Sequence, residues 1–181
     1  MKAASIALAT VTYASFIWAA LFFFKTGNSG SKRGKVLIGL MGFASVLVCM
    51  AALLQCTWQA LPTQWMGVTL LLLSFALFWW AIRTVSNTPL DFAFSTRAPD
   101  RLVTQGPYAY WRHPFYASYS FGWLGAAFIA QSVWPLFVTI AMAFVYCRAA
   151  LSEERNFKSG ELGDEYQRYS EKSKLIVPWV I

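Results

Sequence analysis

The chain has 181 residues, of which 57% are hydrophobic and 18% aromatic, while only 13% are charged. The charged share is about half of that in an ordinary soluble domain, which argues against a typical water-soluble protein. A net charge of +7 would be compatible with nucleic acid binding in a soluble protein, but here the basic residues flank long apolar blocks, so we expect a membrane protein with no nucleic acid partner.

Three apolar blocks in the first half of the chain are long enough to cross a bilayer, which takes about 20 residues. They run from Ala3 to Phe24, from Val36 to about Trp58, and from about Trp65 to Ile82. The first block looks like a secretory signal, but it exceeds the usual apolar core of about 7 to 15 residues. We therefore interpret it as a retained anchor.

The segment from Thr84 to Phe115 is too polar and too rich in proline to span, so we predict a structured cytosolic loop. Two shorter apolar blocks follow, Tyr116 to Gln131 and Val133 to Cys147, and a tight turn between them predicts a helical hairpin over residues 116–147. After Arg148 the chain becomes polar with helical periodicity. The predicted fold is all-α, a polytopic membrane protein with five transmembrane helices.

The placement of charge supports five crossings, because Lys and Arg favour the cytoplasmic side of short loops. With five crossings, every basic residue except Lys2 falls on one side, and the connections on the other side carry no formal charge. We therefore expect the N-terminus outside and the C-terminus in the cytosol, in a bacterial or archaeal cytoplasmic membrane. Four crossings, with one short block re-entrant, would place the C-terminal tail against this bias.

The most informative segment runs from Leu102 to Tyr116 and contains the only histidine, His113. Gly106 and Pro107 form a turn signal, and Pro114 suits the first turn of a helix while favouring an extended conformation at His113. Such a helix start can bind a carboxylate or phosphate, and the nearby aromatic rings can bind a purine or a sulfonium. Taken alone, however, the aromatic residues fit an ordinary membrane-interface belt.

A second polar element follows the last apolar block. It contains Arg148, the pair Glu153 and Glu154, the run from Gly163 to Tyr169, and Pro178. Taken alone, this tail fits a solvated helix whose charges are spaced i,i+4.

Together, the two elements resemble the isoprenylcysteine carboxyl methyltransferase and phospholipid methyltransferase families. The resemblance covers about residues 100–178 and rests on Gly-Pro-Tyr, Arg-His-Pro-x-Tyr, Glu-Glu, Gly-x-Glu-Tyr-x-x-Tyr and a late proline. It implies an S-adenosylmethionine-dependent methyltransferase that acts on a lipidic acceptor, either a prenylcysteine-like carboxylate or a phospholipid amine, with small thiols also compatible.

We expect one folded unit, in which residues 1–83 form transmembrane helices one to three with short loops and residues 84–181 form the catalytic part. The cytosolic loop and the C-terminal helix would form the cofactor site. The implied cofactor-binding residues are Leu102, Val103, Gly106, Tyr108, His113, Pro114, Phe115, Tyr116, Glu153 and Glu154. Arg148 and Glu153 are the implied catalytic residues, with Arg148 near the methyl acceptor, and the division of roles between the two glutamates stays open.

We expect no metal site, because Cys49, Cys56 and Cys147 lack histidine or acidic partners at a ligand spacing. The strongest alternative function is an NADPH-dependent membrane reductase of the sterol or steroid type, which shares the Arg-His-Pro-x-Tyr pattern. A non-enzymatic membrane scaffold or channel is a third possibility.

Overall fold

The computed structural model describes residues 1–24, 32–86 and 102–176, and for residues 32–35 it describes the backbone only. The predicted all-α class is confirmed for these residues. The elements are α1 (Lys2–Trp18), a π-helix η1 (Ala19–Phe23), α2 (Lys32–Gln55), α3 (Pro62–Val85), a 3-10 helix η2 (Gly106–Ala109), α4 (Pro114–Ala130), α5 (Val133–Lys158) and α6 (Gly163–Lys172).

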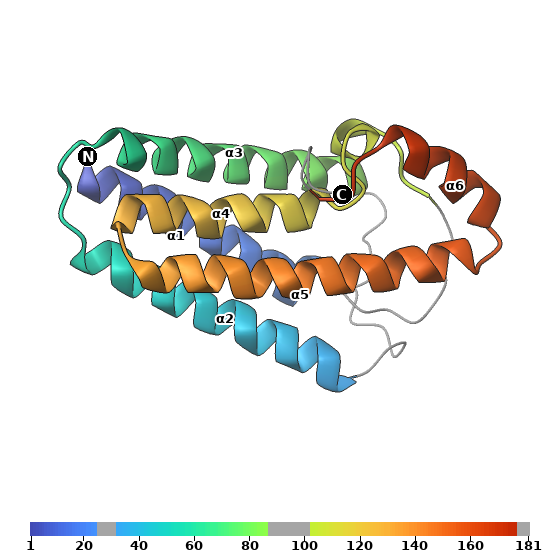
Figure 1. The fold of residues 1–181 in the computed structure, drawn as a ribbon, viewed down its shortest axis with the longest axis horizontal. Coiled ribbons are helices and arrows are strands. Elements are labelled where there is room, and N and C mark those ends of the chain that lie inside the picture. Colours follow the sequence, from blue (N-terminus) through green and yellow to red (C-terminus); the bar gives the residue numbers. More distant parts are fainter. Residues whose placement is uncertain (25–31, 87–101, 177–181) are drawn as a thin grey trace.

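Helices α1 to α5 lie side by side and alternate in direction along the bundle (Figure 1). The N-terminus, the α2–α3 connection and the α4–α5 turn lie at one end, and α6 lies at the other. Helix α4 is central, because it packs against α1, α2, α3 and α5. The bundle therefore brings the end of α3, the start of α4 and the last turns of α5 to the same end as α6.

Within the described residues, four helical stretches are long and apolar enough to cross a membrane, namely Lys2–Phe23, Val36–Gln55, Pro62–Val85 and Val133–Lys158. Their outward faces carry exposed hydrophobic side chains, including Phe22, Leu40, Leu72, Ile140 and Phe144. A continuous apolar exterior of this kind suits contact with lipid, where a helix satisfies its own backbone hydrogen bonds. Helix α4 has 17 residues and is not among the four.

Helices α3 and α4 approach each other closely through small residues. A β-carbon added at Gly67 would lie 2.6 Å from the Gly125 carbonyl oxygen, and one added at Gly125 would lie 2.9 Å from the Gly67 carbonyl oxygen. Polar contacts hold the same interface, since the Ser74 hydroxyl donates to the Ser118 carbonyl at 2.7 Å. Small residues and interhelical hydrogen bonds are what stabilise helix packing in lipid, where the hydrophobic effect is absent.

The start of α3 differs from the sequence prediction, because the helix begins at Pro62 and not near Trp65. Pro114 occupies the first helical position of α4, as predicted, where the missing N–H costs nothing. The turn between α4 and α5 is short, with Gln131 in the left-handed region at φ 51° and Ser132 as the N-cap of α5.

The largest difference is the length of α5, which continues to Lys158 instead of ending near Cys147. The apolar pattern stops at Arg148, but the following residues are good helix formers with no Gly or Pro until Gly160. Helix α5 therefore carries Arg148, Glu153 and Glu154 on one continuous rod. Some residues used in the sequence prediction lie outside the described residues. They are Lys25, Arg97 and Arg101, which contribute to the charge bias, and Pro178, the late proline of the family motif.

Candidate functional site

The segment that leads into α4 is anchored to the end of α3. Gly106 has φ of +59°, a conformation that favours glycine. A β-carbon at this position would also collide with the Thr84 side chain. Pro107 and Tyr108 are buried in η2, so the Gly-Pro signal does place a turn against the bundle, as predicted.

The C-terminal segment pairs with this loop through backbone hydrogen bonds. The Arg112 N–H donates to the Lys174 carbonyl at 2.7 Å, the His113 N–H donates to the Leu175 carbonyl at 3.1 Å, and the Lys174 N–H donates to the Tyr110 carbonyl at 2.9 Å. The Tyr169 hydroxyl of α6 donates to the Tyr108 carbonyl at 2.7 Å. Two regions about 60 residues apart in sequence therefore form one layer at the end of the bundle.

Glu153 of α5 contacts two residues of the predicted histidine motif, His113 and Tyr116. One carboxylate oxygen accepts the Tyr116 hydroxyl at 2.7 Å, and the other lies 3.4 Å from Nδ1 of His113. The His113 ring is stacked on the Tyr116 ring, with centroids 5.4 Å apart and planes 14° from parallel. The lone histidine and the first glutamate of the pair are therefore brought together from α5 and the start of α4.

Glu154 has a different partner. Its carboxylate lies 2.7 Å from Nε of Arg112, with both side chains almost buried. The same guanidinium donates through Nη1 to the carbonyls of Ser170 and Ser173, each at 2.7 Å. Arg112 therefore ties α5 to the end of α6, and its donors in this contact are occupied by protein acceptors.

An aromatic stack continues from His113 into the bundle. The Tyr116 ring lies parallel to that of Tyr146 on α5, with centroids 5.1 Å apart and planes 8° from parallel. The Trp123 indole N–H then donates to the Tyr146 hydroxyl at 3.2 Å. These rings fix the orientation of the Tyr116 and His113 side chains.

Two buried polar atoms of the described residues have no protein partner, the Tyr108 hydroxyl and Nε2 of His113. Burial, with smaller effects of Tyr169 and Glu153, raises the pKa of the Tyr108 phenol above its ordinary value, so at neutral pH it is a hydrogen-bond donor. A buried polar atom without a partner costs about 1 to 3 kcal/mol. A polar ligand that reaches either atom would remove the cost at that atom, which fits a site for the predicted nucleotide-like cofactor and its methyl acceptor.

The other predicted residues are placed as follows. Pro114 is buried at the start of α4, and Phe115 is turned toward the bundle, with its ring 5.7 Å from that of Phe78. Leu102 and Val103 are half-buried in the loop. None of these four has a polar contact with the His113 and Glu153 cluster in the described residues.

Arg148 is not brought into the cluster, and its side chain is exposed. It precedes Glu153 by five residues on the same helix, which separates the two side chains by about 140° around the axis. Its predicted catalytic role therefore stays a prediction, with the side chain on the outward face of α5.

Sequence reasoning missed Arg112, Tyr146 and Tyr169 as site residues. Arg112 stands directly before His113 in the motif, so its position was a usable signal, but its partner Glu154 was not foreseeable from spacing. Tyr146 lies inside an apolar block, where a tyrosine has no distinguishing pattern.

A polar hollow of about 360 Å³ lies at the α5–α6 turn, and none of the predicted site residues lines it. Its lining residues are Lys158, Gly160, Glu161, Gly163, Asp164 and Gln167.

Comparison with known proteins bears on the same region. The family model of the phospholipid methyltransferases matches residues 62–164, which include α3, the His113 segment, α4 and the Glu153–Glu154 pair. The comparison with individual curated proteins gave no match. Because the family model covers more than half of the chain, the chain belongs to the phospholipid methyltransferase family, a family of membrane methyltransferases.

Proposed function

We propose that the protein uses S-adenosylmethionine to methylate a lipidic acceptor at the cytosolic face of the membrane. The observation that carries the proposal is the contact of His113 and Tyr116 with Glu153, together with the buried Tyr108 hydroxyl and Nε2 of His113, which have no partner among the described residues. The residues proposed to hold the cofactor are those predicted from the sequence, with Tyr108, His113, Tyr116 and Glu153 at the centre. The cofactor would supply an activated methyl group, and the protein would supply orientation and exclusion of water.

We also propose that α4 crosses the membrane as a fifth span. Its 17 residues cover about 26 Å, close to the hydrocarbon thickness of about 30 Å. Because α4 is surrounded by other helices, it need not match the lipid thickness by itself. The proposed orientation has the N-terminus outside and α6 in the cytosol.

The acceptor is proposed to be a phospholipid amine or a prenylcysteine-like carboxylate, and the family match gives no support to a reductase. Arg148 is proposed to bind an anionic group of the lipid, either its phosphate or its carboxylate. Its exposed position, about 23 Å along α5 from Val133, is close to the expected membrane surface.

Calorimetry on the detergent-solubilised protein tests the choice of cofactor. We expect S-adenosylmethionine to bind and NADPH not to bind. Tyr108→Phe should weaken S-adenosylmethionine binding by about 5- to 30-fold, because the loss of one hydrogen bond in a buried site costs about 1 to 2 kcal/mol. The control Glu165→Gln, on the exposed side of α6, should bind as the wild type does, and binding of NADPH alone would contradict the proposal.

Replacement of Arg148 tests the acceptor contact. Arg148→Ala should lower turnover of the lipid acceptor while leaving the affinity for S-adenosylmethionine unchanged, because the side chain lies away from the His113 cluster. The matched control is Arg155→Ala, seven residues later on the same side of α5 and also exposed. Equal turnover in Arg148→Ala and wild type would remove Arg148 from the mechanism.

A further inference from the structure

We infer that His113 and Glu153 form a proton-accepting pair for methylation at nitrogen, with Nε2 of His113 taking the proton from the acceptor amine. The inference rests on the proposed function, because it assigns a role in that reaction. It goes further by choosing the amine over the carboxylate acceptor and by naming the atom that receives the proton.

The first support is the geometry of the imidazole. Nδ1 lies 3.4 Å from Glu153, the backbone N–H is bonded to the Leu175 carbonyl, and the ring is stacked on Tyr116. A carboxylate beside Nδ1 favours the tautomer whose proton is on Nδ1, which leaves the lone pair on Nε2. That atom is buried and has no partner among the described residues.

The second support is the balance of charge around the ring. The titratable groups that surround this cluster are Tyr108 from η2, Tyr116 and Tyr119 from α4, Tyr146 and Glu153 from α5, Tyr166 and Tyr169 from α6, and the ion pair of Arg112 with Glu154, whose carboxylate also lies 3.9 Å from Nζ of Lys158. Arg112 is neutralised by Glu154 and bonded to two backbone carbonyls. The described groups near the ring therefore provide a carboxylate, phenols and aromatic faces, which attract an ammonium group and disfavour a second carboxylate.

An amine needs such a pair, whereas a carboxylate does not. A lipid amine arrives largely protonated and must lose a proton before or during transfer. The ammonium first gives one proton to Nε2, which leaves a lone pair on the nitrogen. That lone pair then forms the bond to the methyl carbon, while the carbon–sulfur bond breaks with its electrons kept on sulfur. The resulting imidazolium, stabilised by Glu153, releases the proton to water after the reaction.

The tautomer of His113 can be measured without turnover, because it is the only histidine in the chain. Nitrogen NMR of protein labelled with ¹⁵N-histidine should show one neutral imidazole protonated on Nδ1 in the wild type. Glu153→Ala should shift the ring toward the ordinary tautomer protonated on Nε2, while the control Glu165→Gln should leave it unchanged. A wild-type ring protonated on Nε2 would overturn the inference.

The pH dependence of activity is the second measurement, made with phosphatidylethanolamine in mixed micelles. His113→Gln removes the proton acceptor but keeps a polar side chain, and it should reduce turnover at neutral pH by about 10² to 10⁴-fold. Turnover by His113→Gln should then rise by about tenfold per pH unit, because the free amine becomes more abundant. Wild-type turnover should depend far less on pH. His113→Asn serves as the second variant, and an unchanged thermal unfolding midpoint in detergent verifies that each variant is folded.

The outcomes separate this inference from the proposed function. If the wild type methylates phosphatidylethanolamine and His113→Gln has the wild-type pH profile, the proton-accepting pair is wrong but the methyltransferase stands. If the wild type methylates only an N-acylated S-prenylcysteine, the inference also fails and the methyltransferase stands. If the wild type neither binds S-adenosylmethionine nor methylates either acceptor, the proposed function itself fails.

Discussion

Adjacent glutamates on α5 have different partners, because consecutive residues of a helix point about 100° apart. Glu153 faces His113 and Tyr116, whereas Glu154 faces Arg112 and through it the end of α6. We interpret Glu153 as the residue available to the reaction and Glu154 as the residue that holds α6 in place. This division of roles is our proposal for the two glutamates, whose separate roles the Glu-Glu motif left open.

Conservative substitution of each glutamate tests this division. Glu154→Gln weakens a nearly buried ion pair and should increase proteolysis and hydrogen exchange of residues 159–176, because α6 loses part of its attachment. Glu153→Gln should lower turnover while α6 keeps its protection. Equal loss of protection in both variants would contradict separate roles.

At the scale of elements, the contact between α3 and α4 sets the position of the candidate site. These helices approach through Gly67 and Gly125, and α4 begins with the His113–Pro114 step. A change in their spacing would therefore displace the start of α4 relative to Glu153. The continuous helix α5 has the complementary role of carrying Glu153 beyond the apolar region to meet it.

Substitution of a single glycine measures the importance of this approach. Gly67→Ala should destabilise the protein by about 1 to 3 kcal/mol, because the added carbon overlaps the Gly125 backbone. The matched control is Gly39→Ala on α2, where the added carbon has no atom within 4 Å and helix propensity improves. Thermal unfolding in detergent should show a lower midpoint for Gly67→Ala only; equal midpoints would show that α3 and α4 separate at little cost.

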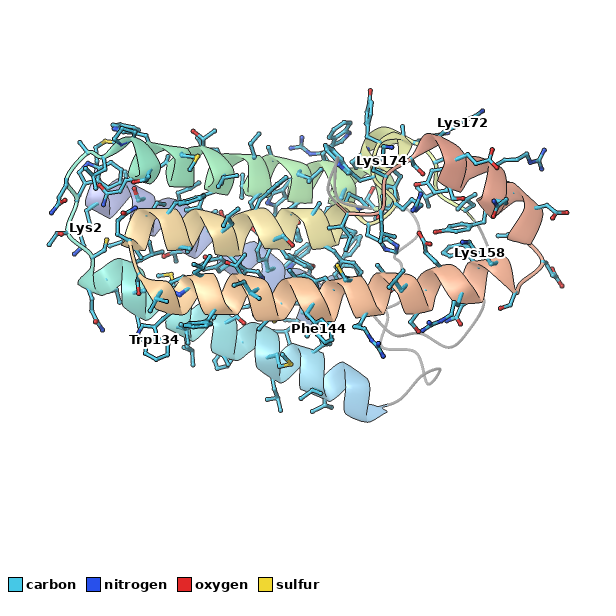
Figure 2. The ribbon with its side chains drawn as sticks, viewed as in Figure 1. Lys2, Trp134, Phe144, Lys158, Lys172 and Lys174 are labelled. Atoms are coloured by element: carbon cyan, nitrogen blue, oxygen red, sulfur yellow. The ribbon has the colours of Figure 1, made fainter. Side chains whose placement is uncertain are left out.

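At the scale of the whole molecule, described charges gather at the end of the bundle that carries α6. Figure 2 shows Lys158, Lys172 and Lys174 at that end and Lys2 at the other. Lys2 donates to the Leu54 carbonyl near the end of α2 at 2.8 Å, where a cation is favoured by the helix dipole. This contact gives a reason for the position of Lys2, the one basic residue predicted to lie on the side of the membrane opposite to the others.

Cysteine labelling tests the five-span topology. In a variant whose three native cysteines are replaced by alanine, Val133→Cys at the α4–α5 turn should react with an impermeant reagent only from outside. Lys172→Cys on α6 should react only from the cytosolic side, because the two positions lie at opposite ends of the bundle (Figure 1). Labelling of both positions from the same side would contradict five crossings.

The sequence by itself determined the helical class, the three long apolar helices of the first half and the segments that bear the polar motifs. It could do so because bilayer thickness demands long apolar runs and because Gly106, Pro107 and Pro114 restrict the backbone locally. It could not locate the end of α5, since helix propensity continues after hydropathy falls at Arg148.

Only the tertiary structure decided which motif residues meet. Sequence order places Arg112 and His113 about 40 residues before Glu153 and Glu154, and no periodicity relates one pair to the other. Their pairing results from the alternating bundle, the close approach of α3 to α4 and the rotation of α5 about its axis. Those features depend on side-chain packing between distant segments, so they also decided that Arg148 faces outward while Glu153 faces the histidine.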